Sequence, residues 1–293
     1  WSWVLTLFWN RKGLRLFRSP MAIEVFAPAK INLSLHVIGR RGDGYHLLDS
    51  LVAFADLGDH LQLEPGPEMS IELSGPFAEG VPQDQRNLVW KAAQGLGWAG
   101  AIHLNKQLPH GAGIGGGSSD AAALLNALAG DGFEVPVDLP LSLGADLPVC
   151  MAATAARMQG IGEQITPVPL PELPALLVNP GCHVPTGAVF SALQSRENAP
   201  MPTEVPRFDG ISDCADWLAE QRNDLEAPAR GAAPDIDRVL GDLTASRGAF
   251  LSRMSGSGAT CFALYPTKKA AHMAAYEIGA EHPDWWIRAV TLR

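Results

Sequence analysis

The chain has 293 residues, enough for one large domain or two ordinary ones. Hydrophobic residues make up 47% of it and charged residues 18%, a globular composition that excludes a largely disordered chain. The formal net charge is −9 and no run of lysine and arginine follows residue 20, which argues against nucleic acid as a partner.

The first twenty residues differ in character from the rest of the chain. Residues 1–9 include three tryptophans, and a signal peptide would carry its charge before such a stretch, whereas here the basic residues come after it. Nine residues are also too few to cross a bilayer, so we expect no membrane span. We predict that residues 1–20 are a leader or extension outside the fold, with a peripheral membrane or partner contact as the alternative. The basic residues are Arg11, Lys12, Arg15 and Arg18.

The four cysteines are widely separated and show neither the close pairs of a zinc site nor a disulfide framework. Each lies among apolar residues, which favours small buried side chains. Reduced thiols of this kind are typical of a cytoplasmic protein. The cysteines are Cys150, Cys182, Cys214 and Cys261.

The first predicted elements are two strands joined by a turn. Residues 23–35 form an apolar segment interrupted at 27–30, and the alternation of apolar residues beyond it is typical of a half-buried strand. Residues 39–44 are rich in arginine, glycine and aspartate and predict a turn, after which residues 47–57 return as an apolar segment. This β-rich opening places Lys30 at the entrance of a strand.

A strand, a glycine loop and a helix are predicted next, in that order. Residues 87–96 have helical spacing, and a short strand over 102–104 leads the chain to Pro109. The glycine loop follows at once. The alanine and leucine content of residues 120–129 then predicts a helix, which the serine pair 118–119 can cap.

The second half is predicted to form a further unit of helices and strands. Proline-rich residues 166–174 mark a hinge, a strand over 175–179 follows it, and residues 198–208 predict a surface loop. Residues 250–265 predict two strands joined by a Ser-Gly repeat, which fits a plain hairpin and an active-site loop equally well. We therefore predict an α+β chain of two domains with the active site between them, an N-terminal nucleotide-binding domain of residues 21–157 and a C-terminal domain of residues 158–293.

The glycine loop packs five glycines into seven residues directly before the predicted helix. Glycines let backbone N–H groups turn toward an anion, and the helix N-terminus adds roughly half a positive charge. No Lys-Ser or Lys-Thr pair follows, so the loop is not a Walker A motif, and no early βαβ unit supports a dinucleotide fold. A phosphate site of another class is predicted, with a flexible linker as the alternative. The glycines are Gly111, Gly113, Gly115, Gly116 and Gly117.

A carboxylate between a glycine turn and a proline is the next candidate. Asp146 lies in an apolar stretch, where a buried carboxylate is costly unless a cation pairs with it. Lys30 is the candidate partner, and such a pair could take a proton from a substrate hydroxyl. Alternatively, Asp146 caps a helix or turn and Lys30 is a solvated surface cation.

Four motifs in this order resemble those of the GHMP kinases, the superfamily of galactokinase, homoserine kinase, mevalonate kinase and phosphomevalonate kinase. The resemblance runs from residue 22 to the C-terminus. Its first two motifs are typical of the branch that phosphorylates a cytidine diphosphate derivative of a methylated sugar alcohol in the non-mevalonate isoprenoid pathway. The motifs are residues 28–33 (PAKINL), 41–47 (RGDGYHL), 113–119 (GIGGGSS) and 143–149 (LGADLPV).

The resemblance implies roles for the residues in these motifs. Asp146 would accept the proton of the substrate hydroxyl, while Lys30 would keep Asp146 anionic and stabilise charge as the γ-phosphoryl group moves. ATP is the implied phosphate donor, and Mg²⁺ is expected with it, with the hydroxyl of Ser119 as a candidate ligand. The implied nucleotide-binding residues are Asn87, Lys106, Pro109, Gly111, Gly113, Gly115, Gly116, Gly117, Ser118 and Ser119.

The resemblance also implies a site for the cytidine diphosphate substrate. Tyr45 would offer an aromatic plane to the cytosine and His46 a ring nitrogen, with Phe190 as the opposing stacking ring. Asn32 would line the sugar-alcohol pocket, and Thr186 would lie beside it. For His46, an ordinary loop histidine is the alternative.

Two other functions stay open on the sequence alone. One is another GHMP kinase, acting on mevalonate, homoserine or a sugar, and the other is a binding or regulatory protein that kept the fold and lost phosphoryl transfer. For each kinase reading, the expected partner is a small molecule, without nucleic acid or membrane. The expected protein is a cytoplasmic monomer or weak homodimer.

Overall fold

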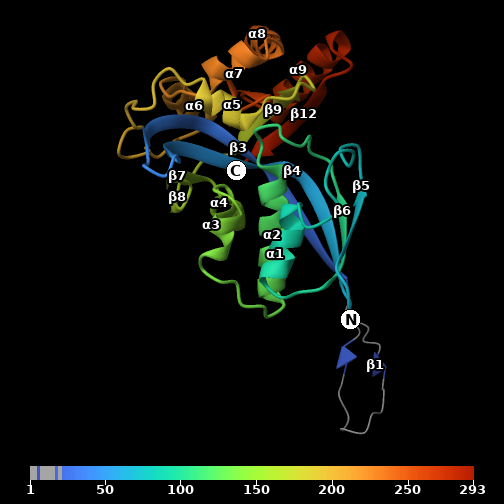
Figure 1. Ribbon diagram of the computed structural model, residues 1–293. Helices are drawn as coiled ribbons and strands as arrows, with labels where there is room; N and C mark the ends of the chain where they lie inside the picture. Colours follow the sequence, from blue (N-terminus) through green and yellow to red (C-terminus); the bar gives the residue numbers. More distant parts are fainter. Residues whose placement is uncertain (1–4, 7–16, 19–21) are drawn as a thin grey trace.

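The computed structural model describes residues 5–6, 17–18 and 22–293, so most of the predicted leader lies outside the described residues (Figure 1). Two short strands, β1 (Leu5–Thr6) and β2 (Phe17–Arg18), pair with each other in antiparallel fashion. Among the described residues, no helix combines the length and the apolar character needed to cross a membrane.

In the described part of the chain, ten further strands form one mixed sheet. The sheet has the order β10-β11-β9-β12-β4-β6-β5, while β3 and β7 also pair with β4, and β8 pairs with β7. Only β5 and β6 run parallel among these described pairs. The strands are β3 (Ile23–Arg40), β4 (His46–Pro65), β5 (Ser70–Ser74), β6 (Gly100–Asn105), β7 (Ala156–Gly160), β8 (Gln164–Pro167), β9 (Leu173–Asn179), β10 (Leu251–Met254), β11 (Cys261–Leu264) and β12 (Trp286–Leu292).

The long hairpin of β3 and β4 is the centre of the molecule (Figure 1). Its register shifts between Pro28 and Lys30 and at two later points, and such bulges bend a strand and re-aim its side chains. At the first shift the backbone N–H of Lys30 donates to the carbonyl oxygen of Ile114, at 3.0 Å. The hairpin is thereby fastened to the glycine loop.

Two helices cover one face of the lower part of the sheet, α1 (Leu88–Gly95) and α2 (Gly116–Gly130) (Figure 1). Alternate residues of β4 and β6, such as Leu61 and Leu104, are buried in one cluster with alanines and leucines of α2. Burial of each such leucine is worth about 1.5–3 kcal/mol, so α2 is held firmly beneath the loop that precedes it. The short helices α3 (Leu139–Leu143) and α4 (Leu147–Ala152) complete this layer.

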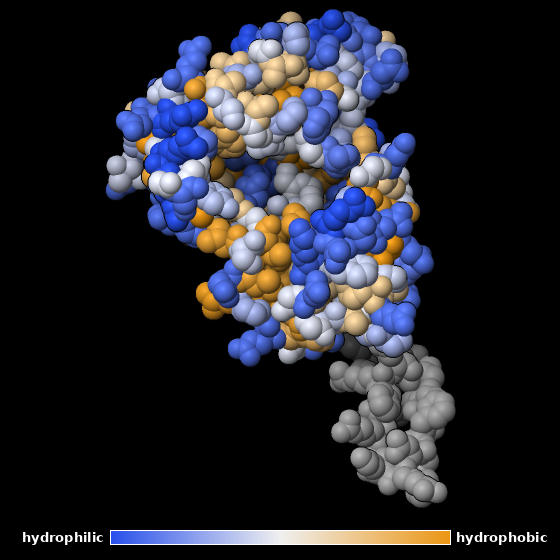
Figure 2. All heavy atoms as spheres, in the orientation of Figure 1, coloured by the Kyte–Doolittle hydropathy of each residue, from blue (hydrophilic) through white to orange (hydrophobic). Residues whose placement is uncertain are grey.

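The other helices gather with β9 to β12 in the upper part of Figure 1. Their apolar faces pack on the strands in a second and a third buried cluster, the latter including Tyr265 and Ile236. Figure 2 shows a hollow in the face of the molecule between this upper part and the lower layer of α1 and α2. The helices are α5 (Thr186–Ser191), α6 (Ile211–Ala219), α7 (Glu226–Ala232), α8 (Asp235–Ala245) and α9 (Lys268–Glu281).

The predicted cap of the glycine-loop helix is wrong. The structure begins α2 at Gly116, with Gly115 at the N-cap position and a left-handed φ of 66°. Ser118 and Ser119 therefore lie inside the helix, where the backbone N–H of Ser119 donates to the carbonyl oxygen of Gly115 at 2.8 Å. Glycine reaches this backbone conformation at little cost, so the loop turns into the helix earlier than the serines suggested.

Other sequence-based expectations are confirmed. The turn after β3, the helix near Asn87, the strand before Pro109 and the irregular segment 198–208 are all present. The predicted domain boundary, between residues 157 and 158, falls inside β7. Strand β12 from the second half of the chain also pairs with β4, with Leu292 opposite Ala55, so the sheet continues across the two predicted domains. The exact division of the chain at this boundary stays a prediction.

Candidate active site

Several positions of the glycine loop have backbone conformations and close contacts that favour glycine. Gly111, Gly113 and Gly115 all have positive φ angles, of 64°, 75° and 66°. A Cβ atom at Gly113 would lie 2.4 Å from the carbonyl oxygen of Ser255, well inside any permitted contact. The loop therefore leaves its own backbone N–H groups uncovered by side chains at the start of a fifteen-residue helix, where phosphate binds readily.

Lys30 and Asp146 meet beside this loop. The Nζ atom of Lys30 lies 2.8 Å from Oδ2 of Asp146, and the lysine side chain is 4% exposed against 35% for the aspartate. A Cβ atom at Gly115 would lie 3.2 Å from Cβ of Lys30, so the pair stands directly against the loop. Asp146 occupies the N-cap position of α4 but makes no side-chain capping bond. The geometry thus favours the ion pair over the helix cap that the sequence left open.

The Ser-Gly turn between β10 and β11 packs on the glycine loop from the other side. The hydroxyl of Ser255 accepts from the backbone N–H of Asn32 at 3.0 Å and donates to the carbonyl oxygen of Gly113 at 2.9 Å. The side-chain amide of Asn223 donates to the carbonyl oxygens of Met254 and Gly256, at 2.8 Å each. The Ser-Gly turn therefore joins two paired strands and also holds the glycine loop in place through hydrogen bonds. Sequence reasoning gave neither Ser255 nor Asn223 a role.

The residues predicted to hold the cytidine substrate carry two unsatisfied polar atoms. Asn32 donates through Nδ2 to the hydroxyl of Ser50 at 2.8 Å, while its Oδ1 is buried and accepts no hydrogen bond. The rings of His46 and Phe190 stack, with centroids 4.7 Å apart and planes 25° apart, and Nε2 of His46 is likewise buried without a partner. Buried polar atoms without partners are rare in proteins, so both atoms are candidates for ligand contacts.

The environment of His46 favours its neutral form. Burial lowers its pKa from the ordinary value, and the nearby guanidinium groups of Arg40 and Arg196 lower it further. A neutral imidazole has one nitrogen that accepts a hydrogen bond and one that donates. Tyr45, one residue earlier, is 57% exposed, and the hydroxyl of Thr186 lies 2.8 Å from that of Ser257.

Several predicted nucleotide-binding side chains already have protein partners. The side chain of Asn87 caps α1, accepting from the backbone N–H of Val89 at 2.9 Å. Lys106 is 2% exposed and forms ion pairs with Asp120 and Asp59. Pro109 is buried. Ser118 is partly buried in the first turn of α2. The roles of these residues toward a nucleotide stay predictions.

The predicted role of Ser119 as a Mg²⁺ ligand stays a prediction. Its hydroxyl donates to the carbonyl oxygen of Pro28 at 2.6 Å, and the residue is 1% exposed. In the described residues, no group of three or more histidine, cysteine, aspartate or glutamate side chains is arranged to hold a metal ion.

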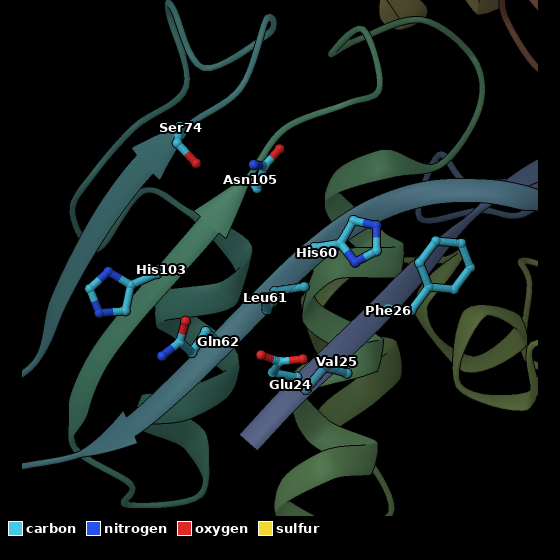
Figure 3. A pocket seen from close by; sticks show the side chains of 9 residues that line it. All are labelled: Glu24, Val25, Phe26, His60, Leu61, Gln62, Ser74, His103 and Asn105. Atoms are coloured by element: carbon cyan, nitrogen blue, oxygen red, sulfur yellow. The ribbon is translucent and has the colours of Figure 1, made fainter. Parts of the chain in front are cut away.

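A separate depression lies on the opposite face of the sheet from α2. It holds about 500 Å³ and is lined by residues of β3, β4, β5 and β6, with Phe26 tilted over His60 at a centroid distance of 5.2 Å (Figure 3). None of the predicted site residues lines it. The predicted site residues therefore lie elsewhere in the molecule.

The fold and the loop define a small-molecule kinase, and comparison with known proteins agrees. The family described as GHMP kinases N terminal domain matches residues 87–158, and the one described as GHMP kinases C terminal matches residues 203–284. The chain belongs to the GHMP kinases, a family of small-molecule kinases that use ATP as the phosphate donor.

Two relatives within this superfamily carry the name of the same kinase. A protein of Dinoroseobacter shibae named 4-diphosphocytidyl-2-C-methyl-D-erythritol kinase is 57% identical over 273 residues, which cover 92% of this chain and 95% of that protein. A protein of Cereibacter sphaeroides with the same name is 53% identical over 270 residues, covering 90% and 97% of the two chains.

Solved structures show the same fold. The crystal structure of a 4-(cytidine 5'-diphospho)-2C-methyl-D-erythritol kinase has a TM-score of 0.74 and 36% identity, covering 92% of this chain and 99% of that one. A homoserine kinase from Cytophaga hutchinsonii, 19% identical with a TM-score of 0.63, covers 94% and 98% and shares the fold.

Proposed function

We propose that this chain transfers the γ-phosphoryl group of ATP to a hydroxyl of 4-diphosphocytidyl-2-C-methyl-D-erythritol, a step in the non-mevalonate isoprenoid precursor pathway. The observation that carries the proposal is the ion pair of Lys30 and Asp146 against Gly115. In this proposal Asp146 is the general base and Lys30 is the cation, and both lie next to the loop that binds phosphate. The substrate is inferred from the names of relatives at 53–57% identity.

In the proposed mechanism, Asp146 accepts the proton as the substrate hydroxyl attacks. The Lys30 ammonium, at 2.8 Å from the carboxylate, holds the base in position beside the glycine loop. The new bond joins the substrate oxygen to the γ-phosphorus, and the bond from that phosphorus to the leaving ADP oxygen breaks in line. Because the side chain of Asp146 is one-third exposed, a substrate hydroxyl can reach it.

The glycine loop and α2 supply the proposed nucleotide site. Three left-handed glycines turn the loop, and the N-terminus of α2 places the positive end of its dipole there. Phosphoryl transfer depends mainly on positioning and on stabilising the charge that develops, and both come from this rigid backbone. Mg²⁺ would neutralise β- and γ-phosphate oxygens when bound, and its use by this chain stays a prediction.

The cytidine end of the substrate is assigned to Tyr45, His46 and Phe190. A neutral His46 with a free, buried Nε2 can hydrogen-bond the edge of a pyrimidine, and the Tyr45 and Phe190 rings offer stacking faces. Since the rings of His46 and Phe190 stack on each other, with centroids 4.7 Å apart, a base does not fit between these two rings and would stack on an outer face. The free Oδ1 of Asn32 is assigned to a hydroxyl of the methylerythritol.

Substrate choice tests the proposal. Purified protein should consume ATP with 4-diphosphocytidyl-2-C-methyl-D-erythritol and not with mevalonate or homoserine, and cytidine diphosphate should compete with the true substrate. Turnover of only a control substrate would make the chain another GHMP kinase. Tight ligand binding without turnover of any of them would indicate a regulatory protein. Lys30→Met and Asp146→Asn variants provide the catalytic controls.

A further inference from the structure

A histidine that the proposed mechanism does not use lies against the glycine loop. His183 belongs to the connection between β9 and α5, residues 180–185, and is exposed. A Cβ atom at Gly111 would lie 3.8 Å from both Cε1 and Nδ1 of the histidine ring. Because this is an ordinary van der Waals distance, the ring edge that carries Nδ1 borders the start of the loop.

Buried polar contacts join the end of β9 to the same loop. Oδ1 of Asn179 accepts from the backbone N–H of Gly181 at 2.8 Å, and its Nδ2 donates to the hydroxyl of Thr260 at 2.9 Å. The backbone N–H of Thr260 donates to the carbonyl oxygen of Ala112 at 3.1 Å. Asn179 is 3% exposed and Thr260 is fully buried. Since satisfied buried hydrogen bonds rigidify the groups that they join, the connection that carries His183 has a defined position relative to the loop.

The other end of the connection is held by the Ser-Gly turn. The hydroxyl groups of Thr186 and Ser257 lie 2.8 Å apart, and in the same turn the hydroxyl of Ser255 donates to a carbonyl oxygen of the glycine loop. Val184, between the histidine and Thr186, is buried in an apolar cluster. His183 thus extends from a segment that is fixed on both sides. Little ordering of the backbone is then needed when its side chain binds a ligand.

Two lysines that reach the glycine loop are already engaged with carboxylates. Lys30 pairs with Asp146 at 2.8 Å, and Lys106 forms ion pairs with two buried carboxylates. A bound phosphate chain brings several negative oxygens to a loop whose own contribution is its backbone N–H groups. An imidazole ring has at least one N–H donor in either protonation state. His183 can therefore add a donor at the loop without disturbing either set of ion pairs.

We propose that the imidazole of His183 binds a phosphate group held against the glycine loop, by donating a ring N–H to a non-bridging phosphate oxygen. The inference rests on the proposed function, because both proposed substrates, ATP and the cytidine compound, carry linked phosphates. His183 is a binding residue in this account and takes no part in proton transfer. Asn179 is the positioning residue that sets the place of His183 through Thr260.

Binding measurements with ligands that differ in their phosphates test the proposal. In His183→Ala, the Kd of a non-hydrolysable ATP analogue or of cytidine diphosphate should rise roughly five- to twentyfold, while the Kd of adenosine and of cytidine, measured by competition, should stay within about twofold. A loss confined to the ATP analogue assigns the histidine to the nucleotide, and a loss confined to cytidine diphosphate assigns it to the other substrate. His183→Asn, whose amide nitrogen can replace Nδ1, should recover part of the affinity. The control is His272→Ala, at an exposed histidine of α9, which should bind as the wild type does.

Two results would overturn the phosphate contact. One is wild-type affinity of His183→Ala for both phosphorylated ligands. The other is an equal loss of affinity for adenosine and cytidine, because the residue would then shape the site without binding phosphate. Since His183 is exposed, the urea unfolding midpoint of His183→Ala should match that of the wild type, so that lost binding is not lost folding. Absence of ATP-analogue binding by the wild type would instead overturn the proposed function.

Discussion

Substitution of Gly113 by alanine is expected to damage the phosphate loop severely. The residue has a φ of 75°, and a Cβ atom there would lie 2.4 Å from the carbonyl oxygen of Ser255 and 2.8 Å from the backbone nitrogen of Gly258. A left-handed alanine costs about 1–2 kcal/mol, and displacing a backbone contact on a buried turn adds about 1–2 kcal/mol more. We expect a total of about 2–4 kcal/mol.

That cost should appear as lost stability or as lost nucleotide affinity, because the loop must move away from Ser255. Since about 1.4 kcal/mol corresponds to a factor of ten, the Kd for an ATP analogue should rise at least about tenfold in Gly113→Ala. Calorimetric titration and urea unfolding measure the two effects. Gly130→Ala, at the open end of α2 with no atom within 4 Å of its Cβ position, is the control and should bind as the wild type does. Wild-type affinity and stability in Gly113→Ala would refute the reasoning.

Three further predictions follow from other contacts. The pKa of Asp120 is raised from 3.8 to about 7, so its protonation stabilises the folded state at low pH; that contribution should be lost as the pH rises toward 7, and the loss should be absent in Asp120→Asn. Asp49→Ala leaves the buried guanidinium of Arg157 without its carboxylate, which lies 2.6 Å away, and should cost about 3–5 kcal/mol in urea unfolding. Phe190→Ala removes the ring that stacks on His46 at the proposed cytidine site and should raise the KM for the cytidine substrate roughly three- to tenfold, leaving the KM for ATP unchanged.

The sequence predicted the local elements well where composition and spacing are strong. The β3–β4 turn, the strand before Pro109 and the irregular segment 198–208 carry glycine, proline or alternation signals that act over a few residues. The start of α2 was misplaced because serine is the better N-cap by preference, whereas the left-handed Gly115 decides where this loop turns.

Contacts between distant segments were harder to predict. Pairing of Lys30 with Asp146 was expected from chemistry, yet the competing helix cap was excluded only by the geometry of α4. The contacts of Asp59 with Lys106 and of Ser255 with Gly113 bring together segments that lie far apart in the sequence. No local pattern predicts such contacts, because they depend on how distant strands and loops pack against one another.

Turnover by Asp146→Asn tests the central claim most directly, because the side chain is one-third exposed and makes no capping bond that the substitution would break. With ATP and 4-diphosphocytidyl-2-C-methyl-D-erythritol, kcat should fall by about 10²–10⁴-fold while the Kd of an ATP analogue stays within a few-fold of the wild type. A variant that keeps wild-type kcat would contradict the assignment of this carboxylate as the base beside the phosphate loop.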